Sequence, residues 1–288
     1  MPAFTRITIV GVGLIGGSIG LALRRRGLAR WVRGVVRRTA SGEVARACGA
    51  VDEATANLVE GVQGADLVVV ATPVDQIVDT VRSVAYLNPQ ALVTDVGSTK
   101  ALICRLLREP APADLPQRRP GPGQFVGSHP LAGDHRSGPE HARADLLEGR
   151  MVVVTPEEAS PPAAVERLAL FWRELGAEVE LLDPEEHDRA LAATSHLPHL
   201  VASALAAATP ETWLRFTARG WSDTTRIAAS SPELWSQIFT QNRSAVIDAV
   251  QRLQHALDAL RDAVAREDRP KLLHLLEEAK RRRDAVGD

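Results

Sequence analysis

The sequence has few cysteines. Cys48 and Cys104 are the only two among 288 residues, and their separation matches neither a zinc motif nor a redox pair. Two isolated, reduced thiols are typical of proteins that stay in a reducing compartment. We therefore expect a cytoplasmic protein.

Excess charge and long apolar runs are lacking as well. The formal net charge is −2, so no basic field favours nucleic-acid binding. No uninterrupted apolar run is long enough to cross a bilayer, and the first strand begins by Ile7, too early for a secretory signal. These absences disfavour nucleic-acid-binding, membrane and secreted classes. The 45% of hydrophobic residues is enough for a substantial core in one large domain or two.

A glycine-rich turn is the most informative feature that is present. Residues 7–10 predict a short buried strand, and an amphipathic run to Arg26 predicts a helix after the turn. The spacing Gly-x-Gly-x-x-Gly lets the chain turn tightly, the pyrophosphate approach the backbone, and the helix pack near the strand with its positive N-terminus at the phosphates. The alternative is a strand–helix turn that binds nothing. The expected cofactor contacts are Gly11, Gly13, Leu14, Ile15 and Gly16.

Strand and helix patterns continue to alternate over residues 1–183. This alternation predicts a doubly wound sheet in a Rossmann-type α/β domain. The Pro- and Gly-rich residues 110–123 are expected to form a loop. The expected strands are 31–36, 67–71, 91–95, 125–127, 151–154 and 178–182, and the expected helices include 43–48, 76–84 and 164–175.

Only helical patterns follow, over residues 184–288. Asp183 is a good N-cap and Pro184 suits the first turn. We expect helices at 185–208, with a kink at Pro198, at about 211–220, at 232–266 and from Pro270. The third carries a heptad-like apolar seam, which suits a neighbouring helix of the same subunit or of a second copy, and we expect a homodimer through these helices. The members of the seam are Val246, Val250, Leu253, Leu257, Leu260 and Val264.

The end of the second strand indicates which nicotinamide cofactor is bound. An acidic residue there usually holds the ribose hydroxyls of NAD, but this position is Val36. The following Arg37, Arg38 and Thr39 suit a 2′-phosphate, which predicts NADP rather than NAD. The alternative is a solvated strand end. Thr72 and Pro73, at the end of the strand expected at 67–71, complete the expected cofactor contacts.

Four further motifs follow the glycine turn along the chain. They are DVGSTK (95–100), GSHPLAG (127–133), SHLPH (195–199) and SDTTRIA (222–228). In this order they resemble the prephenate/arogenate dehydrogenase family of tyrosine biosynthesis, from Ile7 to the last helix. The resemblance implies NAD(P)-dependent oxidative decarboxylation of arogenate to tyrosine, or of prephenate to 4-hydroxyphenylpyruvate.

The resemblance also implies roles for individual residues. His129 corresponds to the catalytic histidine, and a neutral imidazole can accept the hydroxyl proton of the substrate. Ser98 corresponds to the serine that hydrogen-bonds this histidine and the substrate. The alternatives are that His129 closes a strand–loop turn and that Ser98 is the N-cap of the helix starting near Lys100.

Three residues of the second domain are expected to bind substrate. Arg226 corresponds to the arginine that holds a carboxylate, with a surface ion pair to Asp223 as the alternative. His199 corresponds to a substrate-binding histidine, and His196 supports the kink or the substrate site. The two histidines lack further ligands, so we expect no metal. The other histidines are interpreted as surface or structural: His135, His141, His187, His255 and His274.

No residue that can be named recognises the side chain by which arogenate and prephenate differ. The arginine pair and compact size resemble the NADP-dependent arogenate dehydrogenases of photosynthetic bacteria, which favours arogenate. A β-hydroxyacid or imine dehydrogenase is an alternative, but it would use a lysine that the early helices of the second domain lack. A non-catalytic NADP-binding sensor is another, and it would not need Ser98, His129 and Arg226 together.

Overall fold

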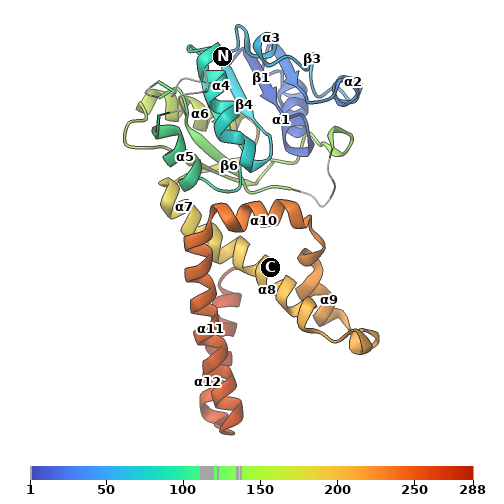
Figure 1. Cartoon of the computed structure of the whole chain (residues 1–288), viewed down its shortest axis with the longest axis vertical. Helices are drawn as coiled ribbons and strands as arrows, with labels where there is room; N and C mark the ends of the chain where they lie inside the picture. The colour runs from blue at the N-terminus through green and yellow to red at the C-terminus, as the bar shows by residue number, and fades with distance from the viewer. Residues whose placement is uncertain (1, 111–119, 122, 134–135, 137, 288) are drawn as a thin grey trace.

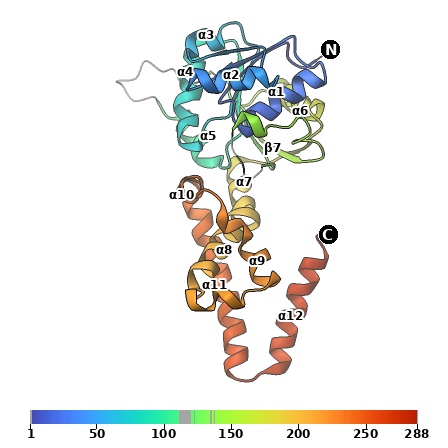
Figure 2. The same ribbon diagram turned by 90° about the vertical axis from the view of Figure 1, so that its right-hand side faces the viewer.

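The computed structural model describes residues 2–110, 120–121, 123–133, 136 and 138–287. An α/β domain is followed by a domain made of helices, which projects from it as two legs (Figures 1 and 2). The predicted fold class, a Rossmann-type domain followed by an all-helical one, is confirmed. Most of the loop expected at 110–123, and His135, lie outside the described residues.

The first sheet is fully parallel, with strand order β3-β2-β1-β4-β5. All four residues of β4 are buried, as expected for a central strand covered by helices on both faces. Because the strands are parallel, the segments that follow β1, β4 and β5 emerge at one edge. The strands are β1 (Arg6–Val10), β2 (Trp31–Val35), β3 (Glu53–Thr55), β4 (Leu67–Val70) and β5 (Leu92–Asp95).

A second, three-stranded sheet is present where a single doubly wound sheet was expected. It contains β6 (Gly127–Pro130), β7 (Met151–Thr155) and β8 (Glu178–Leu181). β6 runs antiparallel to β7, so the sheets are not one doubly wound parallel sheet. The strand expected at 125–127 is wrong by two residues at its start, because Phe125 makes only a single bridge to Val93. His129 consequently lies inside β6.

Helices cover both faces of the first sheet (Figure 1). β3 and α3 were not predicted, because each is too short to give a periodic pattern. The elements are α1 (Leu14–Arg25), α2 (Thr39–Ala47), α3 (Leu58–Val62), α4 (Ile77–Leu87), α5 (Ala101–Arg108) and α6 (Pro162–Glu174), with 3₁₀ turns η1 (Val74–Gln76) and η2 (Pro139–His141).

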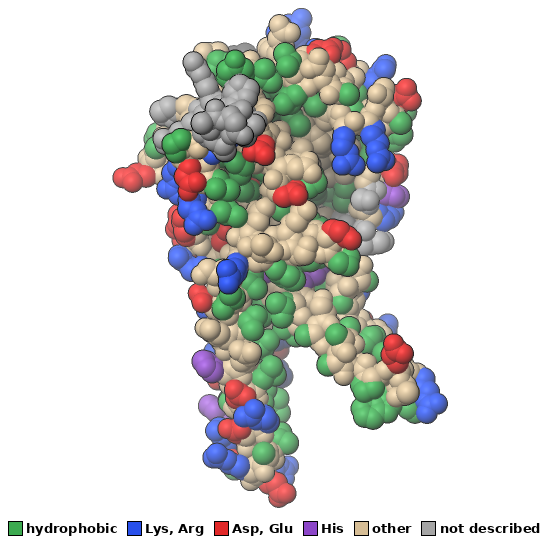
Figure 3. All heavy atoms as spheres, in the orientation of Figure 1, with side chains coloured by type: hydrophobic (Ala, Val, Ile, Leu, Met, Phe, Trp, Pro, Cys, Tyr) green, Lys and Arg blue, Asp and Glu red, His purple; other side chains and the backbone are tan. Residues whose placement is uncertain are grey.

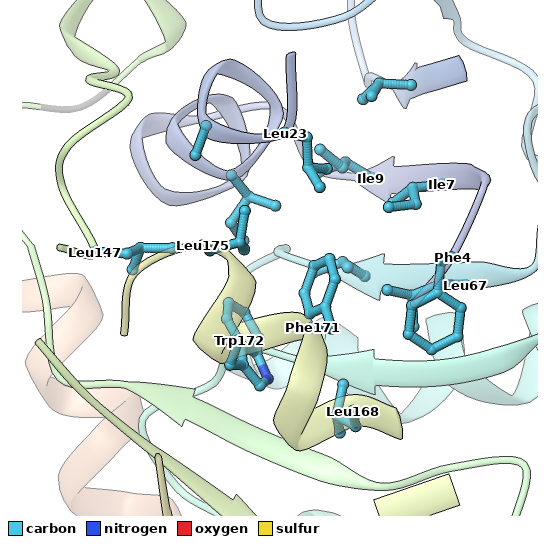
Figure 4. Packing of buried hydrophobic residues seen from close by; sticks show 14 of the residues in the cluster. Phe4, Ile7, Ile9, Leu23, Leu67, Leu147, Leu168, Phe171, Trp172 and Leu175 are labelled. Atoms are coloured by element: carbon cyan, nitrogen blue, oxygen red, sulfur yellow. The ribbon is translucent and has the colours of Figure 1, made fainter. Parts of the chain in front are cut away.

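One of the two hydrophobic clusters of the α/β domain lies between α6 and the sheets, and the other lies under α4 and α5. Phe171 and Trp172 of α6 point toward the strands, and Phe4 packs edge-on against Phe171 with ring centroids 5.9 Å apart (Figure 4). Trp172 is fully buried, and an aromatic residue of this kind buries roughly 150–250 Å² of surface. This packing makes the α/β domain a rigid base for the residues at its strand ends.

The second domain deviates from the sequence prediction at three places. The helix expected at about 211–220 is instead a 3₁₀ turn over residues 211–216, followed by a separate helix that begins at Arg219. The helix expected at 185–208 contains a π-helical turn, η3 (Ala192–His196), just before Pro198, whose missing N–H cannot join a regular helix. The helix expected at 232–266 is interrupted at Asn242. The helices are α7 (Pro184–Leu191), α8 (Leu197–Ala208), α9 (Arg219–Thr225), α10 (Pro232–Gln241), α11 (Arg243–Ala265) and α12 (Arg269–Asp284), with 3₁₀ turns η4 (Glu211–Phe216) and η5 (Arg226–Ala229).

One helical stretch, Pro184–Ala208, has the length and composition of a membrane-crossing helix, with a mean hydropathy of 1.2. Length and composition alone do not distinguish such a helix from one that packs within or between subunits. We expected no membrane span because no uninterrupted apolar run is long enough. In the stretch Pro184–Ala208, the polar residues 194–196 interrupt the apolar run.

Candidate active site

The glycine turn forms an open cradle at the start of α1. Gly11 has φ +95°, and a Cβ there would lie 2.5 Å from the carbonyl oxygen of Ala71, whereas a Cβ at Gly13 would meet nothing within 4 Å. Gly13 is also the N-cap of α1 and offers no side-chain cap. The open space at Gly13, at the N-terminus of α1, fits a pyrophosphate.

Two further features fit a dinucleotide at this edge. The Thr72 hydroxyl, in the segment that follows β4, is buried and has no hydrogen-bond partner in the described part of the chain. Arg37 and Arg38, between β2 and α2, and Thr39, the first residue of α2, are exposed. The N-terminus of α2 has no side-chain cap. Guanidinium groups beside a free helix N-terminus provide the chemistry that a phosphate needs.

A cavity of about 660 Å³ lies where the two domains meet. Ser98 and His129 of the α/β domain line it together with His196, His199 and Trp235 of the helical domain. Pro73 and Arg226 are exposed and neither lines this cavity. Among the described residues, no three His, Cys, Asp or Glu side chains are grouped as metal ligands.

His129 is the end of a buried polar chain that runs through His187 to Asp188. Its Nδ1 lies 2.9 Å from Nε2 of His187, and Nδ1 of His187 lies 2.8 Å from Oδ1 of Asp188. Burial lowers the pKa of His129 well below 6.5, and the neighbouring His187, Lys100 and His196 lower it further. His129 is therefore a neutral imidazole at pH 7, able to accept a proton.

Asp188 joins α7 to the start of α5. Its carboxylate accepts hydrogen bonds from the backbone N–H of Lys100 at 2.8 Å and of Ala101 at 3.0 Å. The alternative interpretation of Ser98 as the N-cap of this helix is wrong, because Lys100 is the N-cap and Asp188 supplies the capping oxygens. Ser98 remains partly exposed on the cavity wall; no hydrogen bond joins it to His129 among the bonds of the described residues.

His196 and His199 occupy different environments. The Asn242 side-chain amide donates to the backbone oxygen of Asp188 at 2.7 Å and lies 3.1 Å from Nδ1 of His196. His199 is stacked on Trp235, with ring centroids 3.4 Å apart. Burial and then the charge of Arg226 lower the pKa of His199. Arg226 and Asp223 form no ion pair in the part of the chain that the structure describes.

The sequence interpretation missed three residues of this region. His187 was read as surface or structural, yet it is fully buried and contacts His129. Trp235 and Asn242 were placed inside one long helix. The sequence held a weak signal that His187 is buried. His187 lies one helical turn before the apolar Leu191 on the same helix, and it is followed directly by an aspartate. Nothing in the sequence indicated the partners of Trp235 or Asn242.

The buried histidines predict a loss of stability in acid. Burial lowers the pKa of His196 from 6.5 to about 4, so the unfolded chain binds this proton more readily. Its contribution to stability is complete above pH 6.5 and is lost as the pH falls towards 4, which amounts to about 3 kcal/mol. His196→Asn keeps an acceptor for Asn242 but cannot titrate, so its free energy of unfolding should fall less steeply over this range.

Urea unfolding at several pH values between 7.5 and 4 measures this difference. His274→Asn, which removes an exposed histidine of α12, serves as the control and should follow the wild-type curve. Parallel curves for the wild type and His196→Asn would contradict the prediction.

Comparison with known proteins follows the same division of the chain. Residues 19–181 match the model of the prephenate dehydrogenase nucleotide-binding domain, and residues 183–278 match that of the prephenate dehydrogenase dimerization domain. A prephenate dehydrogenase from Bacillus subtilis (strain 168) is 34% identical over 288 residues, which cover 97% of this chain and 76% of that protein.

Solved structures agree over nearly the whole chain. The prephenate dehydrogenase of A. aeolicus, in complex with hydroxyphenyl propionate and NAD+, has a TM-score of 0.89 and 32% identity, covering 98% of each chain. The arogenate dehydrogenase of Synechocystis has a TM-score of 0.82 and 30% identity, covering 98% of this chain and 100% of that one. Both domain models together span far more than half of the sequence, and the chain belongs to the prephenate dehydrogenase family.

Proposed function

We propose that the protein oxidises and decarboxylates arogenate in preference to prephenate, with NADP as its cofactor. Family membership supports the coarser statement, a prephenate dehydrogenase-type oxidoreductase of tyrosine biosynthesis that uses a pyridine nucleotide. The observation that carries the reaction class is the shared cavity, because Ser98 and His129 of the first domain and His199 of the second line the same space.

The residues around this cavity divide the reaction between them. A bound nicotinamide supplies the hydride acceptor, and the ring carboxylate of the substrate leaves as carbon dioxide. His129 accepts the proton of the substrate hydroxyl, and Ser98 hydrogen-bonds the same oxygen. Arg226 holds a substrate carboxylate through its guanidinium fork. His199, held by its stack on Trp235, contacts the substrate from the helical domain.

The cofactor is held at the strand ends beside this cavity. The backbone at Gly11, Gly13 and Gly16 binds the pyrophosphate, with Leu14 and Ile15 at the turn. Thr72 and Pro73 contact the dinucleotide after β4. Arg37 and Arg38 pair with the 2′-phosphate, and Thr39 adds a hydroxyl. The A. aeolicus relative is in complex with the alternative cofactor, NAD+. For this chain, the proposed preference for NADP rests on the arginine pair.

The arogenate preference is supported by the arginine pair together with the similarity to the Synechocystis arogenate dehydrogenase. Initial rates with arogenate and with prephenate, each with NADP and with NAD, test it. We expect the highest kcat/KM for arogenate with NADP. A higher value for prephenate would overturn the substrate preference and leave the reaction class intact. NADPH binding without turnover of either substrate would favour a sensor.

Replacing both cofactor arginines predicts a change in cofactor use. In the double variant Arg37→Gln, Arg38→Gln, we expect KM for NADP to rise by at least about tenfold, because charge-assisted bonds to the 2′-phosphate are lost. KM for NAD should stay unchanged. Val36 is buried, so placing a carboxylate there would disturb the core and is a poorer test.

Arg46→Gln is the matched control for this experiment. Arg46 lies in the last turn of α2, so its loss removes one positive charge from the same helix at the opposite end. Steady-state kinetics with both cofactors should leave Arg46→Gln unchanged. An unaltered NADP preference in the double variant would overturn the assignment.

The helical domain also supports a homodimer. Exposed apolar side chains lie along α11 and α12, and a separate group lies on η4 at the end of the other projecting part, near α9 (Figures 1 and 3). Leu257 and Val264 of the expected seam are 53% and 61% exposed, so this chain alone does not cover them. We propose that a second copy does, in keeping with the dimerization-domain match over residues 183–278. The apolar residues include Trp213, Phe216, Ile247, Leu257, Val264, Leu273 and Leu276.

A further inference from the structure

We propose that His187 is a positioning residue that determines which ring nitrogen of His129 carries a hydrogen. The inference rests on the proposed role of His129 as the base. His187 itself does not line the cavity. It reaches the reaction only through His129, to which it is hydrogen-bonded at 2.9 Å.

The hydrogen positions follow from Asp188. Both of its carboxylate oxygens act as acceptors, one from the backbone N–H of Lys100 and the other from that of Ala101. An ionised carboxylate can only accept a hydrogen bond. Nδ1 of His187, 2.8 Å away, must therefore carry a hydrogen. Burial lowers the pKa of His187, so its ring is neutral and its Nε2 is an unprotonated acceptor.

The hydrogen positions of His187 determine those of His129. Since Nε2 of His187 accepts, Nδ1 of His129 must donate, and the neutral His129 then has an unprotonated Nε2. Nε2 is the ring nitrogen left for the substrate. During oxidation the O–H bond of the substrate hydroxyl breaks and an N–H bond forms at this Nε2. The chain through His187 to Asp188 stabilises the resulting positive charge.

The opposite tautomer of His129 is catalytically unsuitable. It would carry hydrogen on Nε2 and could not take up the substrate proton. Without His187, water or another group can hydrogen-bond Nδ1 as donor or acceptor, so both tautomers become populated and the ring loses its fixed orientation. Substitution of His187 is therefore expected to affect proton acceptance and not substrate binding. Substitution of His129 would affect both.

Two substitutions at His187 test the proposal. His187→Leu cannot accept from Nδ1 of His129, and we expect kcat to fall about 100-fold while KM for substrate and for NADP changes little. His187→Gln places an amide oxygen near the former Nε2 and can accept the same hydrogen bond. It should recover kcat to within about tenfold of the wild type. Glu186→Leu, an exposed neighbour on α7, should retain full activity.

A measurement independent of turnover is available in the ring ¹⁵N shifts of histidine. With ¹⁵N-histidine labelling, His129→Asn identifies the His129 signals, and wild-type His129 should be protonated at Nδ1 alone. In His187→Leu, its ring nitrogens should show the averaged shifts of mixed tautomers. Protonation of wild-type His129 at Nε2 would overturn the proposal, whether or not the variants fold.

The outcomes separate this inference from the proposed function. If the wild type is active and His129→Asn is not, but His187→Leu keeps the wild-type kcat, the positioning role is wrong and the base assignment stands. If the wild type converts neither substrate, the proposed function fails. The ring ¹⁵N shifts then decide the tautomer of His129 alone.

Discussion

His129→Asn is expected to lower kcat for oxidative decarboxylation by about 10²- to 10⁴-fold, the usual contribution of a positioned base. Asparagine retains a hydrogen-bonding side chain of smaller volume but cannot accept a proton near pH 7. Because His129 lines the substrate cavity and is separate from the glycine turn, the affinity for NADP should stay at the wild-type value. The measurement is steady-state kinetics together with NADPH binding by fluorescence titration.

The matched control is His274→Asn. His274 is exposed on α12, far along the chain from the cavity residues of both domains, and the same chemical change there should leave kcat intact. Wild-type turnover by His129→Asn would show that another group, or water, removes the hydroxyl proton. The neutral state of His129, which follows from its burial, would then have no catalytic use.

Local patterns were sufficient to predict most of the α/β domain. The apolar run at 67–71 became the buried central strand β4, and the glycine spacing produced the tight turn, with Gly11 at φ +95°. These features depend on neighbours in the sequence, so a single sequence contains the necessary information. The antiparallel course of β6 depends instead on its pairing with β7, which no local pattern encodes.

Tertiary contacts explain the break in the second domain that the sequence did not predict. Asn242 has φ −99° and ψ 34°, and its amide reaches Asp188 and His196 rather than the helix. These hydrogen bonds end α10 and turn the chain into α11. An asparagine within a long periodic run gives no sign of partners about 50 residues earlier.

The candidate site was predicted in part for the same reason. Ser98, His129, His196 and His199 sit in motifs that could be located one by one, and the fold brings them to one cavity. His187 could not be connected to His129 from the sequence, because the contact exists only where α7 packs beside β6. Trp235 likewise acquires its significance from the ring of His199 stacked on it.

Lys100→Met is expected to lower the free energy of unfolding by about 3–5 kcal/mol, the usual cost of removing one partner of a buried ion pair. The side chains of Lys100 and Asp95 are both 0% exposed and bonded to each other. Without the ammonium group, the Asp95 carboxylate keeps, among the described residues, only the backbone N–H groups of Gly97 and Ser128 as donors. Urea unfolding followed by circular dichroism measures the change.

An exposed ion pair supplies the control. Lys280→Met removes the partner of Asp284 on the surface of α12, where both side chains are more than half exposed, so the cost should stay below about 1 kcal/mol. If Lys100→Met costs no more than Lys280→Met, the buried pair contributes nothing beyond a surface pair.

The double variant Asp95→Asn, Lys100→Met distinguishes charge from packing. If most of the cost of Lys100→Met comes from the unpaired carboxylate, then neutralising that carboxylate should recover part of the lost stability. If the cost comes from the shape of the lysine side chain, the double variant should be at least as unstable as Lys100→Met. We expect the double variant to recover part of the lost stability. Asp95 lies in β5, and its carboxylate accepts a hydrogen bond from the backbone N–H of Ser128 in β6. An uncompensated charge there strains the junction that positions His129.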